Sequence, residues 1–335
     1  MAGVNRGMLT QTRIILNTNP QVVSRRGAFA SLAALALAAC TTPPPAPSTV
    51  APLPAPPPRP PRIGLALGGG AARGFAHVGV IQVLEEAGIR PALVAGTSAG
   101  SLVAALYASG RTPAQLQQAA EGLDEAAIAD WTLPLFNRGM LRGEALARYV
   151  NQLVDRRPIE QMPLPLGILA TRLDTGEGVL FRRGDTGTAV RASSAVPSVF
   201  LPVRIGPVEY VDGGLVSPVP VRQAREMGAE FVIAVDISAA PEGNPSSDAL
   251  RMLLQTFAIM GKSLNRWELA HADVVVRPAL AGVGSADFAS RRRAIEAGRQ
   301  AMQGALPQLR AALAAATQSA QAEKSPGLST GAKDP

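Results

Sequence analysis

Short apolar runs alternate with segments of helical periodicity from Arg62 to about Ala315. The apolar runs predict β-strands at Ile63–Leu67, Ala92–Ala95, Leu166–Leu173, Val179–Phe181, Val208–Val211, Phe231–Val235 and Val274–Val276. The periodic segments, in which apolar residues recur every three or four positions, predict helices at Ala76–Ala87, Ala99–Ser109, Gly143–Val154, Thr186–Ala192, Val219–Met227, Leu250–Leu269 and Arg291–Ala315. The alternation predicts one domain over residues 62–315, a three-layer α/β/α fold with a mainly parallel central sheet.

Residues that end or begin helices support these boundaries. Gly88 and Gly110 follow the first two predicted helices, and glycine is the usual residue just past a helix end. Thr112 followed by Pro113 is typical of an N-cap and a first helical position, so a further helix is predicted from Pro113.

The N-terminal region has the pattern of an export signal. Residues 1–39 contain four arginines and no acid, and end in an apolar stretch, Ala28–Ala39, that is too short to cross a bilayer as a helix. A basic region followed by a short apolar region is typical of a secretory signal. The signal ends in Leu37-Ala38-Ala39-Cys40, which resembles a bacterial lipobox. We therefore expect cleavage before Cys40 and lipidation of its thiol.

The lipobox predicts an exported, membrane-anchored lipoprotein that faces the periplasm. Thr41 rather than aspartate follows the cysteine, which favours the outer membrane. Ser24-Arg25-Arg26 resembles part of a twin-arginine signal, so the general and twin-arginine routes both stay open. Cys40 is the only cysteine of the chain, and the folded part therefore makes no internal disulfide.

Two further segments have compositions that do not build a core. Residues 40–61 are rich in proline and alanine and predict an extended polyproline linker after the lipidated cysteine. Residues 316–335 are rich in serine, glycine, lysine and glutamine and predict a disordered tail.

The charge of the chain gives little indication of a nucleic-acid partner. The net charge of +7 falls to +3 once the four arginines of the signal are removed. No stripe of basic and aromatic residues is present, so no nucleic acid is expected as a partner. The expected lipid anchor would dominate attachment to the membrane.

Ser98 is the first candidate for chemistry. It lies in Gly96-Thr97-Ser98-Ala99-Gly100, directly between a predicted strand and a predicted helix. A sharp turn at this place exposes a serine hydroxyl to a substrate carbonyl, and the flanking glycines leave room for the turn. The pattern alone is common, and its position between strand and helix is what favours a nucleophile over an ordinary glycine turn.

A glycine-rich loop, Gly68 to Gly74, follows the first predicted strand. One interpretation is a dinucleotide site, but that requires an acidic residue at the end of the second strand, where this chain has Ala95-Gly96. The other is an oxyanion hole, in which backbone N–H groups at a helix start stabilise a negative oxygen. The second interpretation is favoured. Arg73 holds the shape of this loop, binds a phosphate, or is simply a surface arginine at the start of a helix.

A nucleophilic serine needs a base. The chain offers two histidines, His77 and His271. The order Ser98, Asp212, His271 matches that of α/β-hydrolases, but His271 precedes a strand where that fold places its histidine after the last one. Asp212 is the better candidate, because it follows the predicted strand Val208–Val211 and leads into two glycines. A simple Asp-Gly turn is the alternative for Asp212.

Taken together, these segments resemble the patatin-like phospholipase family. The resemblance extends over residues 62–315 and is carried by the glycine loop with His77, by Gly96–Gly100, by Asp212-Gly213-Gly214, and by the runs Gly74-Phe75-Ala76-His77-Val78-Gly79-Val80-Ile81, Leu84-Glu85-Glu86-Ala87-Gly88-Ile89, Arg191-Ala192-Ser193-Ser194-Ala195-Val196-Pro197 and Asp236-Ile237-Ser238. Ser217-Pro218-Val219-Pro220 also resembles the continuation usual in the family.

The resemblance implies a serine acyl hydrolase that uses a Ser–Asp dyad without histidine, metal or cofactor. Carried over by position, Ser98 is the nucleophile and Asp212 the base, and the oxyanion hole is formed by Gly69, Gly70 and Ala71. Supporting positions are Arg73, Gly96, Gly100, Gly213 and Gly214. The substrate implied is a lipid or another acyl ester. Many members have glycine at the position of Ala71, and alanine keeps the N–H donor unless a positive φ is required.

Two alternatives remain at this stage. One is a triad of Ser98, Asp212 and His271. The other is a catalytically idle lipoprotein that binds lipid or a partner. In addition, the apolar residues Trp131, Leu133, Leu135, Phe136 and Met140 form either a lid or acyl groove, or part of the core.

Overall fold

A computed structural model describes residues 59–123, 128–132, 138–239 and 249–322 of the 335-residue chain. Cys40, the predicted signal and residues 40–58 of the predicted linker lie outside the described residues, and so do Leu133, Leu135 and Phe136. Among the described residues, no helix has both the length and the apolar character needed to span a bilayer.

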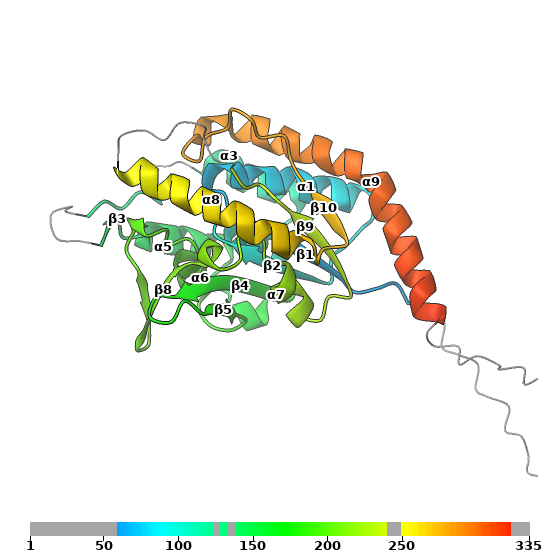
Figure 1. The fold of residues 1–335 in the computed structure, drawn as a ribbon, viewed down its shortest axis with the longest axis horizontal. Helices are drawn as coiled ribbons and strands as arrows, with labels where there is room; N and C mark the ends of the chain where they lie inside the picture. The colour runs from blue at the N-terminus through cyan, green and yellow to red at the C-terminus, as the bar shows by residue number, and fades with distance from the viewer. Residues whose placement is uncertain (1–58, 124–127, 133–137, 240–248, 323–335) are drawn as a thin grey trace, which may run out of the picture. The chain divides into compact units, whose positions relative to one another are not determined.

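Eight strands of the described part form one mixed, mostly parallel sheet (Figure 1). The order along the sheet is β10 (Val274–Val276), β9 (Phe231–Val235), β1 (Ile63–Leu67), β2 (Leu93–Thr97), β4 (Leu166–Arg172), β8 (Val208–Asp212) and β7 (Val203–Ile205), and β5 (Gly178–Phe181) pairs with β4. The five strands from β10 to β4 are parallel, whereas β8, β7 and β5 join by antiparallel pairs. The predicted α/β fold with a mainly parallel sheet is therefore confirmed.

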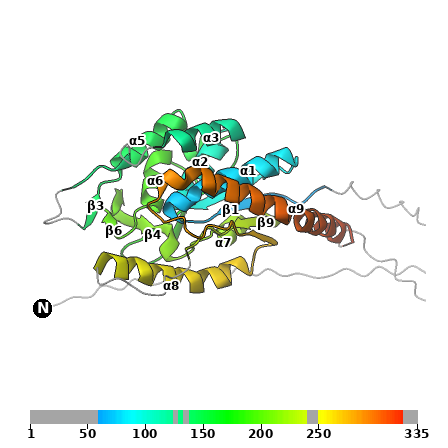
Figure 2. The same cartoon turned by 90° about the horizontal axis from the view of Figure 1, so that it is seen from above.

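Helices cover both faces of the sheet (Figure 2). One face carries α1 (Ala76–Glu86), α2 (Ala99–Ala108), α3 (Pro113–Gly122), α5 (Glu144–Leu153), α6 (Thr186–Ser193) and α9 (Arg291–Ala322). The other carries α7 (Val221–Glu226) and α8 (Ala249–Leu269). Successive residues of a strand point to opposite faces of the sheet. Leu65 and Leu67 of β1 pack against the larger helical layer, whereas Ala66 packs against α7. Burial on both faces explains why the strands are continuous apolar runs.

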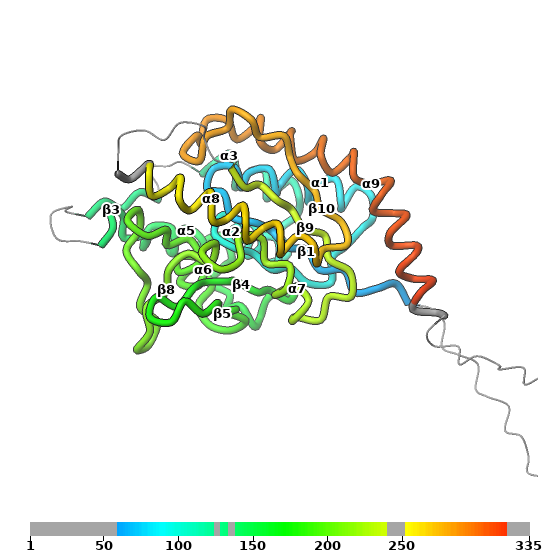
Figure 3. Tube along the Cα trace, in the orientation of Figure 1, coloured from blue at the N-terminus to red at the C-terminus, as the bar shows by residue number. Residues whose placement is uncertain are grey.

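Helices α1 and α9 lie side by side although more than 200 residues separate them in sequence (Figure 3). Their backbones approach closely at two glycines. A Cβ at Gly79 would collide with the carbonyl of Ile295, and one at Gly298 would collide with the carbonyl of Ala76. The glycines are needed here for close packing and not for a special backbone conformation.

Most predicted elements agree with the structure to within two residues, and β1, β9 and β10 agree fully. Three short strands were not predicted: β7, and the pair β3 (Gly139–Leu141) and β6 (Ser198–Phe200), which form a separate two-stranded sheet. Three-residue strands carry too little pattern to be found from sequence. The predicted disordered tail was wrong for residues 316–322, because α9 continues to Ala322 through a stretch rich in alanine and glutamine, both good helix formers.

Candidate active site

Ser98 lies at the turn from β2 into α2, with φ 52° and ψ −124°. A non-glycine residue in this left-handed region is strained, and strain of this kind at a strand-to-helix turn is the mark of a nucleophile elbow. The neighbouring glycines are required by space: a Cβ at Gly96 would collide with the backbone of Gly100, and one at Gly100 would collide with the carbonyl of Leu67. The three residues together aim the serine side chain out of the turn.

A second serine, which the sequence analysis had not selected, fixes the backbone of the elbow. The Ser193 hydroxyl, at the end of α6, accepts a hydrogen bond from the Ser98 N–H at 2.9 Å. The same hydroxyl donates to the Leu169 carbonyl of β4 at 2.5 Å, and the side chain is fully buried. Ser193 therefore ties the nucleophile turn to the centre of the sheet. Its only signal in the sequence was its place in the run from Arg191 to Pro197.

Strand register brings Asp212 to the level of Ser98. Thr97 pairs with Leu169 of β4, so Ser98 is level with the next residue, Ala170. Further along the same edge β4 pairs with β8, where Ala170 is the partner of Asp212, while β5 occupies the opposite edge. Ser98 and Asp212 thus meet beside the same residue of β4, where the ends of β2 and β8 come together on one edge. The Ser98 side chain is there within hydrogen-bond contact of the Asp212 carboxylate.

The Asp212 side chain is only 6% exposed. Burial raises the pKa of this carboxyl from 3.8 to about 6, and hydrogen bonds from the Gly214 N–H and the Ser98 side chain oppose the rise. The Gly214 N–H donates to Oδ1 of Asp212 at 2.7 Å. Gly213 stands where a Cβ would collide with the carbonyl of Leu169. The two glycines after Asp212 therefore have separate tasks, one holding the carboxylate and one permitting close packing.

The glycine loop presents two free amides rather than the predicted three. The Gly69 N–H donates to the Pro218 carbonyl at 2.9 Å and is not available to a substrate. The N–H groups of Gly70 and Ala71 have no acceptor within the described part of the chain. Gly69 still has a role in packing, because a Cβ there would lie 3.1 Å from the Cβ of Ser98.

Ala71 departs from the conformation that alanine prefers. Its φ is 50°, in the left-handed region that favours glycine. This position therefore does require a positive φ, which is the case in which alanine is a poorer fit than glycine. The alanine keeps its N–H donor but adopts a strained backbone, and it begins the short helix η1 (Ala71–Phe75) that leads into α1.

The half-buried side chain of Arg73 and the buried side chain of His77 hold the loop from behind. Arg73 donates from Nε to the Ile237 carbonyl at 2.8 Å and from a terminal nitrogen to the Ser238 carbonyl at 2.9 Å. Arg73 therefore holds the shape of the loop, and its guanidinium is occupied by backbone. His77 Nε2 donates to the Gly68 carbonyl at 2.8 Å. Burial lowers the pKa of His77 to about 4, so the imidazole is neutral at pH 7.

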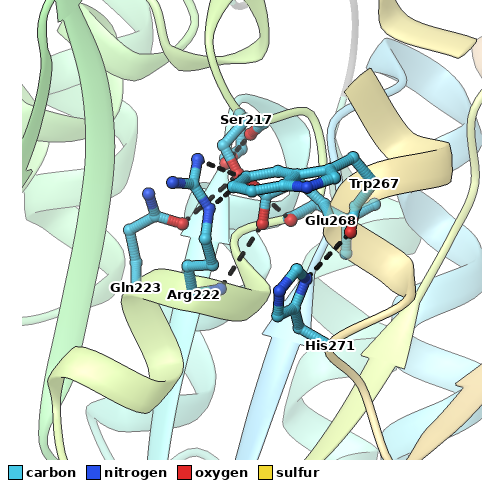
Figure 4. A network of polar contacts seen from close by, with 8 residues as sticks. Ser217, Arg222, Gln223, Trp267, Glu268 and His271 are labelled. Atoms are coloured by element: carbon cyan, nitrogen blue, oxygen red, sulfur yellow. Dashed lines mark hydrogen bonds and ion pairs between the residues drawn. The ribbon is translucent and has the colours of Figure 1, made fainter. Parts of the chain in front are cut away.

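His271 lies away from this group of residues. It precedes β10, whereas Ser98 follows β2, and both strands run parallel in one sheet, so the two residues lie beyond opposite ends of the strands. Figure 4 shows His271 beside Trp267, whose carbonyl contacts Nδ1 of His271 at 2.9 Å. Arg222 lies over the Trp267 ring and pairs with the buried Glu268 in the same cluster. The triad alternative is therefore contradicted by the fold.

Two cavities meet at Ser98. The first, of about 240 Å³, is lined by Ser98, Asp212, the glycine loop and one side of α8. The second, of about 160 Å³, begins at Ser98 and Ala71 and is lined almost entirely by apolar side chains of the helical layer, among them Phe75, Val78, Leu102, Leu106, Leu116 and Leu146. A polar reaction centre with an apolar channel on each side suits an ester of a long apolar acid.

The described residues of the predicted lid or acyl groove, Trp131 and Met140, do not line either cavity. Trp131 is 67% exposed and forms a bridge with Leu141, and Met140 lies in β3. Neither residue belongs to the lining of the two cavities.

Comparison with known proteins agrees with this geometry. A profile of the patatin-like phospholipase family matches residues 65–225, a range that holds Ser98, Asp212 and the glycine loop. An uncharacterized NTE family protein of Mycobacterium tuberculosis is 37% identical over 190 residues, which are 56% of this chain and 52% of that protein. Patatin-like phospholipase domain-containing protein 6 of Homo sapiens is 34% identical over 234 residues, which are 67% of this chain and 16% of that protein.

The match thus spans about half the length of the mycobacterial relative and a smaller share of the human one. Among solved structures, VipD from Legionella pneumophila superposes with a TM-score of 0.50 at 16% sequence identity, over 74% of this chain and 67% of that chain, which supports the fold alone. The profile match and the relatives thus show that residues 65–225 form a patatin-like phospholipase domain, and this family consists of carboxylic ester hydrolases.

Proposed function

We propose that this protein hydrolyses acyl esters of lipids through an acyl intermediate on Ser98. The observation that carries the proposal is the meeting of Ser98 and Asp212 at one residue of β4, inside a cavity that also holds two free backbone amides. This is the minimum that acyl transfer needs: a nucleophile, a base and donors for the oxyanion.

In the first half of the reaction, the Asp212 carboxylate takes the proton of Ser98 while Oγ forms a bond to the ester carbonyl carbon. The N–H groups of Gly70 and Ala71 donate to the oxyanion that results. Loss of one such donor typically costs about 3–4 kcal/mol of transition-state stabilisation. The C–O bond of the ester then breaks, and the alcohol leaves with the proton held by Asp212.

In the second half, Asp212 removes a proton from water as the water oxygen attacks the acyl carbon. The bond between the acyl group and Oγ breaks, Ser98 recovers its proton, and the fatty acid leaves. The apolar cavity beneath Ser98 holds the acyl chain in this scheme, because its lining has almost no polar surface to satisfy. Phospholipase A, lysophospholipase and carboxylesterase activities all follow this chemistry.

The test compares wild type with Ser98→Ala and Asp212→Asn on defined phospholipids and short nitrophenyl esters, with products identified by mass spectrometry. Both variants should lose at least about a thousandfold in turnover, as is typical when the nucleophile or its base is removed. Ser109→Ala, at the far end of α2, is the matched control and should keep full activity. His271→Ala should also remain active, which separates a dyad from a triad.

A silent result from folded wild-type protein against the whole ester panel would favour the idle lipid-binding alternative. Hydrolysis that survives Ser98→Ala would reject the mechanism itself.

We also propose that the chain is exported and anchored by a lipid on Cys40, facing the periplasm from the outer membrane. The lipobox and the proline-rich segment after it support this proposal. Mass spectrometry of the mature N-terminus should find an acylated Cys40, and Cys40→Ser should release the protein from the membrane fraction that wild type occupies. An unmodified N-terminus at an earlier residue would reject it.

A further inference from the structure

The outward face of α8 carries an unusual share of exposed apolar surface. Of the seven large apolar side chains exposed in the described part of the chain, five lie on this helix: Met252, Leu254, Ile259, Met260 and Trp267. Met252 and Ile259 are 48% and 53% exposed and stand seven residues apart, hence on one side of the helix. Soluble surfaces rarely gather apolar side chains in this way without a partner.

The helix that carries this apolar face also borders the active-site cavity. Leu254 and Met260 line the cavity that contains Ser98 and Asp212, and they are also 40% and 49% exposed at the surface. Figure 2 shows α8 lying alone across its side of the molecule, as the outermost helix of that layer. Helix α8 therefore lies between the cavity that holds Ser98 and the outer face that carries Met252 and Ile259.

The charged residues of α8 indicate which kind of partner its apolar face would bind. Lys262 and Arg266 are exposed beside the apolar residues. The only acidic residue of the helix is Glu268, which is 1% exposed and paired with Arg222. A helix with an apolar face and basic flanks, free of exposed acids, is the type that lies in the interface of an anionic membrane.

We propose that the outward face of α8 docks on an anionic lipid surface, with Met252 and Ile259 inserted among the lipids, and that this contact places the Ser98 cavity against the membrane. The proposal deepens the proposed function, on which it rests for the identity of the cavity. It is separate from the expected anchor at Cys40, because it concerns the folded domain itself.

Vesicle sedimentation tests the proposal with the full chain carrying Cys40→Ser, so that no acyl anchor contributes. The probes are vesicles of phosphatidylcholine alone and of phosphatidylcholine with phosphatidylglycerol. The variant Met252→Glu/Ile259→Glu should bind the anionic vesicles at least about tenfold more weakly, because both side chains leave the lipid and add negative charge. Ala311→Glu/Ala314→Glu, which adds the same charge at exposed positions of α9, is the matched control and should bind as wild type does.

A second variant, Lys262→Gln/Arg266→Gln, keeps the apolar residues and should lose the preference for anionic vesicles. Equal binding by Met252→Glu/Ile259→Glu and its control would overturn the proposal. So would a wild-type dimer in sedimentation velocity that the same variant converts to a monomer, because the face would then be covered by a second copy.

The readout is independent of catalysis. Ser98→Ala should bind vesicles as wild type does, so a failed surface and a failed mechanism can be told apart. If Ser98→Ala loses hydrolysis while the α8 variant binds vesicles as wild type does, the proposed function is supported and the docking surface is rejected. If Ser98→Ala keeps hydrolysis while the α8 variant binds more weakly, the docking surface is supported and the proposed function is rejected.

Discussion

Replacing Asp212 by asparagine should make the protein more stable while it abolishes turnover. Asparagine keeps the shape of the side chain and an oxygen that can accept the Gly214 N–H bond, which is 2.7 Å long in the structure. It removes the negative charge that the buried site holds at neutral pH. The change therefore isolates the free energy of keeping an ionised base in an apolar environment.

The size of the effect follows from the pKa of Asp212, which burial raises from 3.8 to about 6. At 1.36 kcal/mol for each pKa unit, the folded state of the wild type is destabilised by about 3 kcal/mol once the group is ionised. This is a large share of the stability of a typical domain.

The effect on stability should change with pH in one direction, with the wild type losing stability as the pH rises. Below pH 3.8 the carboxyl is protonated in both the folded and the unfolded chain, and ionisation adds no difference between wild type and variant. Between pH 3.8 and about 6 the unfolded chain releases its proton while the folded chain retains it, so the wild type loses stability as the pH rises. Above about pH 6 the loss is complete.

Urea unfolding of wild type and Asp212→Asn at pH 4, 6 and 8 measures this difference directly. The variant's advantage in unfolding free energy should grow by about 2 kcal/mol between pH 4 and pH 8, because part of the loss of about 3 kcal/mol is already present at pH 4. Asp174→Asn is the control, because Asp174 is an exposed aspartate whose pKa is lowered by Arg172, and its replacement should give no such gain. A constant difference across the pH series, or a wild type that is the more stable protein at pH 8, would refute the reasoning.

Four further predictions follow from the site. The kcat/KM of wild type should rise with pH and level off above an apparent pKa of about 6, since Asp212 must be ionised to take the proton; a flat profile from pH 5 to 8 contradicts its role. Ala71→Gly should raise the unfolding free energy by up to about 1 kcal/mol, as glycine relieves the positive φ, and thermal unfolding checks this. Ser193→Ala should cost about 1–3 kcal/mol of stability and lower kcat, because the Ser98 N–H loses its acceptor, whereas Ser193→Thr should keep both. Leu102→Trp, one turn after Ser98, should shift preference toward shorter acyl chains, and unchanged chain-length selectivity would move the acyl site elsewhere.

Local patterns in the sequence were enough to predict the main elements and the chemistry of single residues. The apolar runs of β1, β9 and β10 are short, buried and bounded by turn residues, so their limits could be read directly. Thr112 and Pro113 predicted the start of α3, and in the structure Thr112 forms a full capping box at that helix start. The serine between two glycines predicted a nucleophile elbow, because both the turn and its strain arise within five residues.

Other features depend on contacts between distant segments, which one sequence does not contain. Ser98 and Asp212 meet because β4 pairs with both β2 and β8. The residues near Ser98 or Asp212 in sequence do not indicate that register. Assignment of Gly69 to the oxyanion hole failed because its partner, the Pro218 carbonyl, lies far along the chain. Ser193 was overlooked for the same reason.

The sequence by itself thus determined the succession of strands and helices, the glycine loop and the serine at the turn from strand to helix, since each is set by residues within a few positions of one another. Only the tertiary structure decided which carboxylate lies beside that serine, which amides of the glycine loop remain free, and that α8 exposes apolar side chains in the described part of the chain. The reason is physical: propensity and turn geometry act over a few residues, whereas register, burial and the pKa they impose depend on how the whole sheet and its helices pack.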